Sequence, residues 1–338
     1  MLPRNRLVLK FAADSTVPEP MTDSREAPSP HWFRTGIACP SSTHTIDVEG
    51  TTISYELWDQ TDGSQRLPGL VLIHGSNAHL EWWRFIAPML TDQFRIAALD
   101  LSGHGNSGWR ERYDGAQLGR EVWAVCKAAN LGPKPVVVGH SFGGYVALET
   151  AAAFSEHMGG VLFMDYTIAA PENYVEWGLR VEREGVDPNR KLRVYEDRDV
   201  ALGRYRLIPE QPVYYPEVLS HLAEQSLKPV PGGWTWKFDP AIFDYMEMGA
   251  DQQNKLAATT CPIAVVLGED SEDEGAFFAE NMARLSDGLL PIFKVPGTHH
   301  HLMFDEPVAV AMTIKAIVLS WHQAANAQAL RSALDRFV

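Results

Sequence analysis

Cysteine is scarce in this sequence, and the few cysteines are not paired. Cys39, Cys126 and Cys261 are spread through 338 residues, and no two of them form a CxxC pair. A disulfide framework or a cysteine-ligated zinc site depends on such pairing, so the sequence argues against both. Cys126 and Cys261 fall within apolar segments, which predicts buried thiols.

Positive charge is also in short supply. The chain has 29 Lys and Arg against 43 Asp and Glu, for a formal net charge of −14. Such a chain is a poor partner for nucleic acid or an anionic membrane surface. No apolar run suggests a transmembrane segment, and residues 1–13 lack the long apolar stretch of a signal peptide. We therefore expect a cytoplasmic monomer or homodimer that acts on a small molecule and binds neither membrane nor nucleic acid.

The sequence does contain a series of short apolar runs separated by helix-like segments. Two alternating segments around Gly50 come first and predict a hairpin of half-exposed strands. Continuous apolar runs, typical of strands covered on both faces, follow at 70–73, 95–99, 135–138, 161–164, 262–267 and 290–295. Helices are expected at about 80–90, 117–129, 145–154, 277–285 and 308–338. This alternation predicts an α/β fold with a mostly parallel central sheet.

Two regions depart from the alternation. Residues 1–40 are rich in Pro, Ser and charge, which predicts a flexible N-terminal extension. Residues 167–259 hold several prolines and many aromatic side chains, and we expect a mainly helical cap there. Residues 41–166 and 260–338 then form the α/β core.

One pentapeptide, Gly139-His140-Ser141-Phe142-Gly143, carries the strongest chemical signal. A Val-Val-Val strand precedes it and an alanine-rich helical segment follows it. This strand, turn and helix is the setting in which Gly-x-Ser-x-Gly forms a nucleophile elbow, with strand and helix too close for side chains at the glycine positions. Ser141 is therefore our candidate nucleophile.

Four motifs together make the chain resemble the α/β-hydrolase fold superfamily over about residues 43–325. They are His74-Gly75, Asp100-x-x-Gly103-x-Gly105-x-Ser107, the pentapeptide around Ser141, and Pro296-Gly297-Thr298-His299-His300. The resemblance implies a sheet flanked by helices, with the cap after the sixth strand and no cofactor. It does not identify the reaction, because this scaffold hosts many chemistries.

A serine nucleophile needs a base, and the resemblance implies His300. In the family the catalytic histidine lies three residues after the glycine of a Pro-Gly turn and about seven before a proline, as His300 does relative to Gly297 and Pro307. His299 and His301 are then packing or hydrogen-bonding residues. Three consecutive ring nitrogens seldom converge on one ion, so we expect no metal.

The acid that orients His300 is left open between two places. After the strand at 262–267 the family usually supplies Gly-x-x-Asp, whereas this chain has Ser271 at the aspartate's position, with Glu272 beside it and Asp270 and Asp273 nearby. Some members of the superfamily place the acid at the end of the sixth strand instead, where this chain has Asp165. We favour Asp165, with Glu272 as the main alternative.

The oxyanion hole and the substrate pocket are assigned by position. Backbone N–H groups of Phe142 and Ser76 match the two donors that the fold supplies. Asn77 follows Ser76 and is a candidate substrate contact. Of the adjacent Trp82 and Trp83 we expect one in the core and the other, taken as Trp83, in the pocket, with Trp177 contributing from the cap.

These assignments predict a serine hydrolase that cleaves a carboxylic ester with small apolar or aromatic groups. A lactone or thioester would use the same residues. A C–C bond hydrolase of the β-diketone type is the alternative, with Arg180, Arg204 or Arg206 binding a second oxyanion, and a non-hydrolytic binder or cofactor-free oxygenase is a third class. Because the nucleophile is serine, chemistry through an alkyl-aspartyl ester is not expected.

Overall fold

A computed structural model describes residues 29–60, 67–170, 192–272 without 245, 247 and 250, and 279–334, with side chains to residue 327. Eight strands form one sheet in the order β1-β2-β4-β3-β5-β6-β9-β10. The strands are β1 (Ser42–Val48), β2 (Thr51–Trp58), β3 (Gly69–Ile73), β4 (Arg95–Leu99), β5 (Val136–His140), β6 (Gly160–Met164), β9 (Ile263–Gly268) and β10 (Ile292–Val295).

The sheet is parallel from β4 to β10, as the buried apolar runs predict. The hairpin of β1 and β2 is added in antiparallel fashion at the β4 edge. Alternate residues of β3 enter opposite cores: Leu70 and Leu72 face one side, Val71 and Ile73 the other. The predicted α/β fold with a mostly parallel sheet is thus confirmed.

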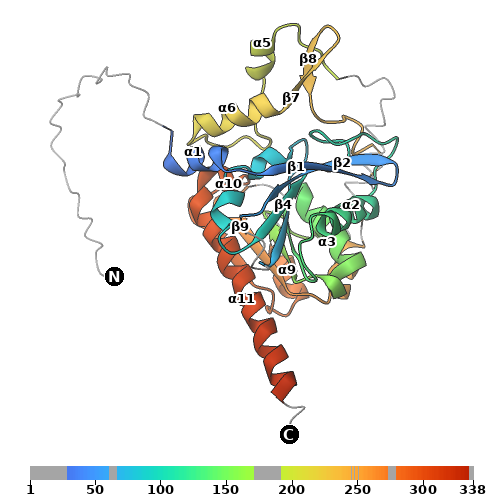
Figure 1. Ribbon diagram of the computed structural model, residues 1–338, viewed down its shortest axis with the longest axis vertical. Coiled ribbons are helices and arrows are strands. Elements are labelled where there is room, and N and C mark those ends of the chain that lie inside the picture. Colours follow the sequence, from blue (N-terminus) through green and yellow to red (C-terminus); the bar gives the residue numbers. More distant parts are fainter. Residues whose placement is uncertain are drawn as a thin grey trace, which may run out of the picture.

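Helices cover both faces of the sheet (Figure 1). One core packs against α2 (Gly115–Ala128), α3 (Phe142–Phe154) and α9 (Ala279–Leu285). The other packs against the 3₁₀ turns η1 (Leu80–Trp83) and η2 (Ala87–Leu90), α10 (Leu302–Asp305) and α11 (Pro307–Leu334). A short 3₁₀ turn, η3 (Ser155–His157), follows α3. The single helix expected at about 80–90 is therefore two 3₁₀ turns, the second with a proline in its first turn.

The N-terminal expectation needs a correction at residues 31–38. Helix α1 (His31–Ala38) is ordered there, and the ring of Trp32 lies 5.7 Å from Phe85 and 5.0 Å from Tyr215. Burial of these rings stabilises a segment that composition alone marks as flexible. Residues 1–28 lie outside the described part of the chain.

The chain between β6 and β9 rises from the sheet (Figure 1) and is not wholly helical. It contains α5 (Arg198–Leu202), α6 (Pro216–Gln225) and α7 (Gln252–Ala258), together with an antiparallel hairpin of β7 (Leu227–Val230) and β8 (Gly233–Trp236). The hairpin turns at Gly232, whose φ of +88° suits glycine. The sequence did not predict this hairpin.

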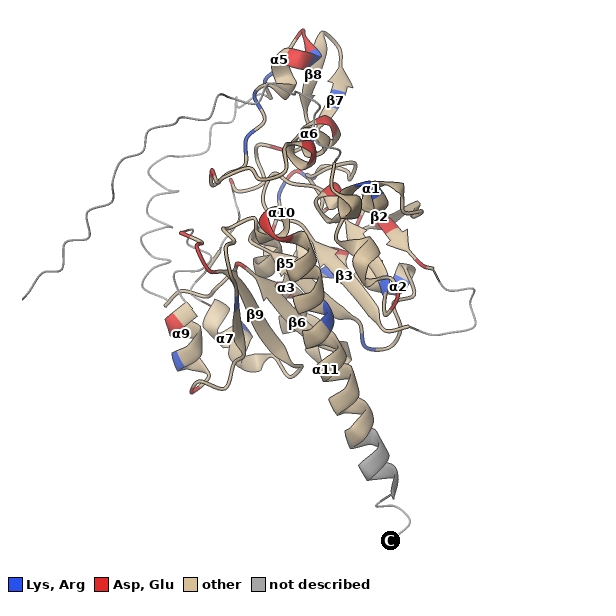
Figure 2. Ribbon diagram, turned by 90° about the vertical axis from the view of Figure 1, so that its left-hand side faces the viewer, with Lys and Arg blue, Asp and Glu red and all other residues tan. Residues whose placement is uncertain are grey.

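Helix α11 is 28 residues long and extends beyond the sheet (Figures 1 and 2). By length and composition alone, residues 307–327 could cross a membrane, contrary to the expectation that no segment is apolar enough. Val310, Ala311, Ile314, Ile317 and Val318 are nevertheless buried along one face against the sheet. That stripe is the pattern of a helix that contributes to a core.

Candidate active site

Ser141 lies at the junction of β5 and α3, with φ +53° and ψ −120°. A positive φ is uncommon for a residue with a side chain and marks a strained turn. A Cβ added to Gly139 would overlap the backbone of Gly143, and one added to Gly143 would overlap the backbone of Ile73 and His74. The two glycines are thus required by the close approach of strand and helix.

His300 reaches this junction from the loop after β10. Its Nε2 lies 3.0 Å from Ser141 Oγ, and its Nδ1 lies 2.7 Å from Asp165 Oδ2. Because a carboxylate only accepts, Nδ1–H donates to Asp165 and leaves the Nε2 lone pair facing the serine hydroxyl. The three side chains therefore have the connectivity of a Ser-His-Asp triad.

Asp165 follows β6 and is fully buried. Its Oδ1 accepts from the Gly268 backbone N–H at 2.9 Å, and its Oδ2 accepts from the Ser271 hydroxyl at 2.6 Å as well as from His300. Its backbone, like that of Ser141, has a positive φ, +46°. Three hydrogen bonds to one buried carboxylate fix its position against the imidazole.

Glu272 does not share this environment. Its side chain is exposed, and it borders a cavity of about 510 Å³ that His300 also lines. Ser271, at the position where the family usually has the acid, instead donates to Asp165. The geometry therefore favours Asp165 over Glu272; Asp273 lies outside the described residues.

The two proposed oxyanion donors belong to two segments that meet near Ser141. Phe142 opens α3, where backbone N–H groups have no partner within the helix. The loop after β3 passes close by, since a Cβ on Gly75 would come 3.4 Å from Ser141 Cβ. Ser76 and Asn77 follow in that loop, and Asn77 is exposed with φ +54°.

His74 fixes the start of this loop. Its Nε2 accepts from the Leu101 N–H at 3.2 Å, so its Nδ1–H donates to the Gly75 carbonyl, 2.7 Å away. Burial lowers the pKa of His74 to about 4, and the neutral ring is the form that can both donate and accept.

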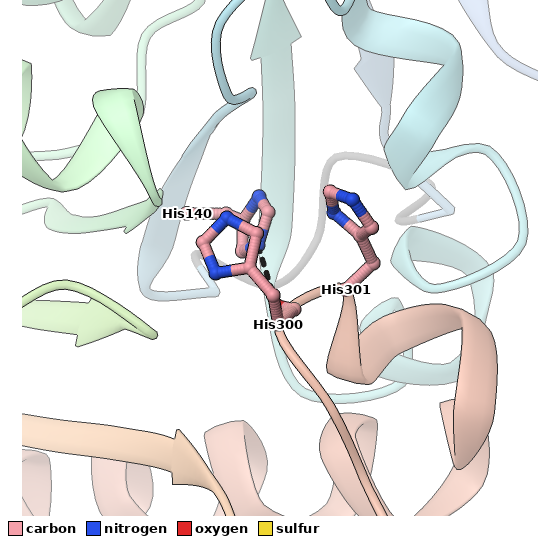
Figure 3. Close-up of side chains that lie close together, drawn as sticks. All are labelled: His140, His300 and His301. Carbon is pink, nitrogen blue, oxygen red and sulfur yellow. Dashed lines mark hydrogen bonds between the residues drawn. The ribbon is translucent and has the colours of Figure 1, made fainter. Parts of the chain in front are cut away.

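A second histidine, His140, holds the catalytic loop and was not predicted as functional. Its Nε2–H donates to the His300 backbone carbonyl at 2.9 Å (Figure 3). Burial keeps the pKa of His140 well below its usual value. A histidine at the variable position of Gly-x-Ser-x-Gly is the only sequence signal for this contact.

His140, His300 and His301 lie side by side, with ligand atoms within 4.8 Å of one another (Figure 3). Three imidazoles can bind a transition metal. Both nitrogens of His300 are already hydrogen-bonded, to Ser141 and Asp165, so a metal bound there would displace one of these partners. The cluster is best explained as the packing around the triad.

The tryptophan pair differs from the prediction, because both side chains are buried in the same core. Trp83 is fully buried, which argues against a pocket role. The ring of Trp82 lies 5.3 Å from His301 and 6.1 Å from His140, beside the candidate site. Sequence alone does not say which of two adjacent tryptophans packs next to the histidines. Trp177 and Arg180 lie outside the described residues.

Gln211 is a second residue near the site that was not predicted from the sequence. Its Oε1 accepts from the His301 backbone N–H at 2.8 Å, and its Nε2 donates to Asp305 at 2.9 Å. Asp305 in turn accepts from the His299 backbone N–H at 2.7 Å. One residue of the insertion thereby ties the α5–α6 segment to the loop that carries His300. Its partners lie 90 or more residues away, and no local pattern reveals them.

The alpha/beta hydrolase family model matches residues 70–313. The 2-(acetamidomethylene)succinate hydrolase of Mesorhizobium japonicum is 25% identical over 262 residues, 74% of this chain and 86% of its own. Esterase Rv0045c of Mycobacterium tuberculosis is 24% identical over 261 residues, 74% and 83% of the two chains.

The structural similarity extends further along the chain. The crystal structure of E-2-(acetamidomethylene)succinate hydrolase has a TM-score of 0.67 at 21% identity and covers 82% of this chain and 98% of its own. Other curated relatives match over only about a third of their own length. The relatives support a hydrolase, and the family match covers most of the chain. This chain therefore belongs to the alpha/beta hydrolase family.

Proposed function

We propose that this protein is a serine hydrolase that cleaves carboxylic esters through an acyl-enzyme on Ser141. One observation carries the proposal: the strained Ser141 presents Oγ 3.0 Å from His300 Nε2, while the opposite ring nitrogen is held 2.7 Å from the buried Asp165. A base within hydrogen-bond reach of the hydroxyl, itself oriented by a carboxylate, is the arrangement that activates a serine.

The reaction follows from the roles of these groups. His300 Nε2 takes the proton of Ser141 as Oγ attacks the ester carbonyl. The backbone N–H groups of Phe142 and Ser76 stabilise the oxyanion, and Asp165 stabilises the imidazolium. His300 then protonates the leaving alcohol. In the second half it deprotonates the water that releases the acid and regenerates Ser141.

Ester cleavage is favoured over other acyl transfers by two kinds of support. A relative over most of the chain is named an esterase. The cavity of about 510 Å³ beside His300 and a second of about 260 Å³ beside Asn77 have room for small groups on either side of a scissile carbonyl. The aromatic residues of the second cavity agree with an apolar or aromatic chain next to the ester.

A fluorophosphonate probe tests the activated serine directly. Wild-type protein should be labelled on Ser141, as mapped by mass spectrometry, and should hydrolyse p-nitrophenyl butyrate. His300→Ala should lose both labelling and turnover, because no base remains to take the proton. His322→Ala, at an exposed position on α11, is the matched control and should retain both. Hydrolysis that survives Ser141→Ala would refute the serine mechanism.

A further inference from the structure

Two cavities of opposite charge border the segment between α5 and α6. The acidic cavity, about 510 Å³, is lined by His299 and His300 together with Glu210, Asp270 and Glu272. The basic cavity, about 260 Å³, is lined by Asn77 together with Arg204, Arg206 and Lys237, and none of its described lining residues is acidic. The segment contributes residues 204–206 and 208 to the basic cavity and residues 209–212 to the acidic one.

The three cations of the basic cavity have no carboxylate partner among the described residues. Arg206 donates only to backbone carbonyls, those of Gly203 at 3.1 Å and Tyr205 at 2.6 Å. Four other arginines of this acidic protein do have carboxylate partners: Arg84 pairs with Glu56 and Glu81, Arg95 with Asp59, Arg110 with Glu121, and Arg120 with Glu49. Three cations at one cavity, without a carboxylate partner in the described part of this chain of net charge −14, form a site of positive local potential.

The walls of this cavity are held in place before any ligand arrives. The Lys237 N–H donates to the Ser226 carbonyl at 2.8 Å, and the Lys237 carbonyl accepts from the Gly105 N–H at 2.7 Å. Tyr205 and Trp236, with ring centroids 6.1 Å apart, supply apolar surface beside the cations. Figure 2 shows basic residues along the segment that runs from α5 towards the sheet. Cationic groups beside an aromatic wall suit a short aliphatic chain that ends in an anion.

One residue on the wall of the basic cavity is next in sequence to the proposed reacting centre. This residue is Asn77, which directly follows Ser76, whose N–H is a proposed oxyanion donor. A substrate whose carbonyl lies at Ser141 can extend towards Asn77 and the cations, or towards the acidic cavity, which His300 lines and which repels an anion. The charges thus define a direction for a substrate with one charged end.

We propose that the preferred substrate is an ester that carries a carboxylate, bound in the basic cavity by Arg204, Arg206 and Lys237. This rests on the proposed ester hydrolysis and adds the substrate class to it. The planar guanidinium groups match a carboxylate in geometry as well as charge. Half-esters of small dicarboxylic acids are the simplest compounds of this class.

Monomethyl and dimethyl esters of the same dicarboxylic acids, from succinate to suberate, provide the test. Initial rates of methanol release give kcat/KM for each pair. At the best chain length, wild type should prefer the monoester by about tenfold or more, the effect of a charge-assisted hydrogen bond. The double variant Arg204→Gln/Arg206→Gln should bring this ratio towards one, and Lys237→Gln should lower it independently.

Lys228→Gln is the matched control. Lys228 lies in β7, its ammonium group is over the ring of Trp109, and it does not line the cavity. This variant should keep the wild-type ratio. Raising NaCl to 0.5 M should lower the ratio in wild type, because salt screens exposed charges. Equal kcat/KM for monoester and diester in wild type would overturn the proposal, as would an unchanged ratio in correctly folded variants.

Failure of the ester mechanism is separable from failure of this inference. If Ser141-dependent cleavage of p-nitrophenyl butyrate is observed but the monoester is not preferred, the carboxylate site is refuted and the ester mechanism is not. If no ester is cleaved, calorimetric titration with adipate still tests the cavity: binding that the double arginine variant abolishes supports it, and no binding refutes it. Tighter binding of an alkyl phosphate than of the alkanoate of equal length would assign the cavity to phosphate and overturn the carboxylate proposal.

Discussion

Two members of the proposed triad, Ser141 and Asp165, are held in backbone conformations that residues with side chains usually avoid, with φ of +53° and +46°. Both follow a parallel strand, at the carboxyl edge of the sheet where the loops converge. Such strain persists only where the surroundings hold it. Here Ser141 N–H donates to the Met164 carbonyl at 2.9 Å, and Asp165 N–H donates to the Val266 carbonyl at 2.8 Å. The neighbouring strands thus aim both side chains at His300.

The choice of acid yields a prediction at this scale. Asp165→Asn should lower kcat by about 10³–10⁴-fold, because an amide in place of the carboxylate disfavours the tautomer of His300 that accepts the serine proton. Glu272→Gln should change kcat by less than about tenfold, because Glu272 is exposed and His300 Nδ1 already donates to the buried Asp165. Rates on p-nitrophenyl butyrate with the circular dichroism of each variant supply the measurement. The reverse order of effects would identify Glu272 as the acid.

Sequence patterns located only the residues whose roles impose a local pattern. Ser141 lies in a turn that demands flanking glycines, and His300 keeps a fixed distance from Gly297 and Pro307. The acid stayed open because burial, which separates Asp165 from Glu272, depends on the folded packing. Gln211 was not foreseen because a single glutamine gives no local sign of partners 90 residues away.

At the scale of elements, the segment between α5 and α6 connects the insertion to the catalytic loop. Gln211 is its attachment point, since it bonds both the His301 N–H and Asp305. The same segment lines both cavities. Its position therefore affects the placement of His300 and the shape of the space for substrate at once.

Gln211→Ala should weaken both functions of this segment. Loss of the acceptor leaves the His301 N–H without its partner, a cost of about 1–3 kcal/mol in stability if water does not replace it. We expect kcat to fall several-fold and proteolysis between α5 and α6 to become faster. Limited proteolysis and ester kinetics measure both effects. Glu224→Ala, an exposed position on α6, is the control, and identical proteolysis of the two variants would contradict an anchoring role.

Whether an element could be predicted from the sequence depends on whether a local residue pattern or a distant contact stabilises it. Buried strands and the β1–β2 hairpin were predictable because their apolar patterns reflect burial on one or both faces. The β7–β8 hairpin was missed because its strands have only four residues each, and Pro229 lies in one of them. Helix α1 was missed because Trp32 and Phe33 gain their stability from Phe85, which is distant in sequence.

At the scale of the whole molecule, five buried histidines have pKa values well below the usual range. Burial lowers the pKa of His74 to about 4 and those of His79 and His301 to about 3, and it holds the pKa values of His104 and His140 well below normal. Three buried acids have the opposite effect on the pH dependence of stability. Burial raises the pKa of Asp100 to about 7, and it also raises the pKa values of Glu121 and Asp305. The five histidines outnumber these three acids, so the histidines should set the sign of the pH dependence.

The last prediction concerns unfolding in acid. Between about pH 6.5 and pH 4 the unfolded chain protonates histidines that the folded chain keeps neutral, so the unfolded state binds more protons and stability falls as the pH falls. Each such histidine costs on the order of 1 kcal/mol per pH unit in this window, and its contribution is fully present above pH 6.5. Urea unfolding at pH 7.5, 6 and 5 measures the slope. His79→Gln should make the slope shallower. The glutamine amide can still donate to the Ser226 hydroxyl, which His79 Nε2 contacts at 2.8 Å. His44→Gln, at an exposed position on β1, is the control and should leave the slope unchanged. Equal slopes for the two variants would show that His79 is not kept neutral by burial.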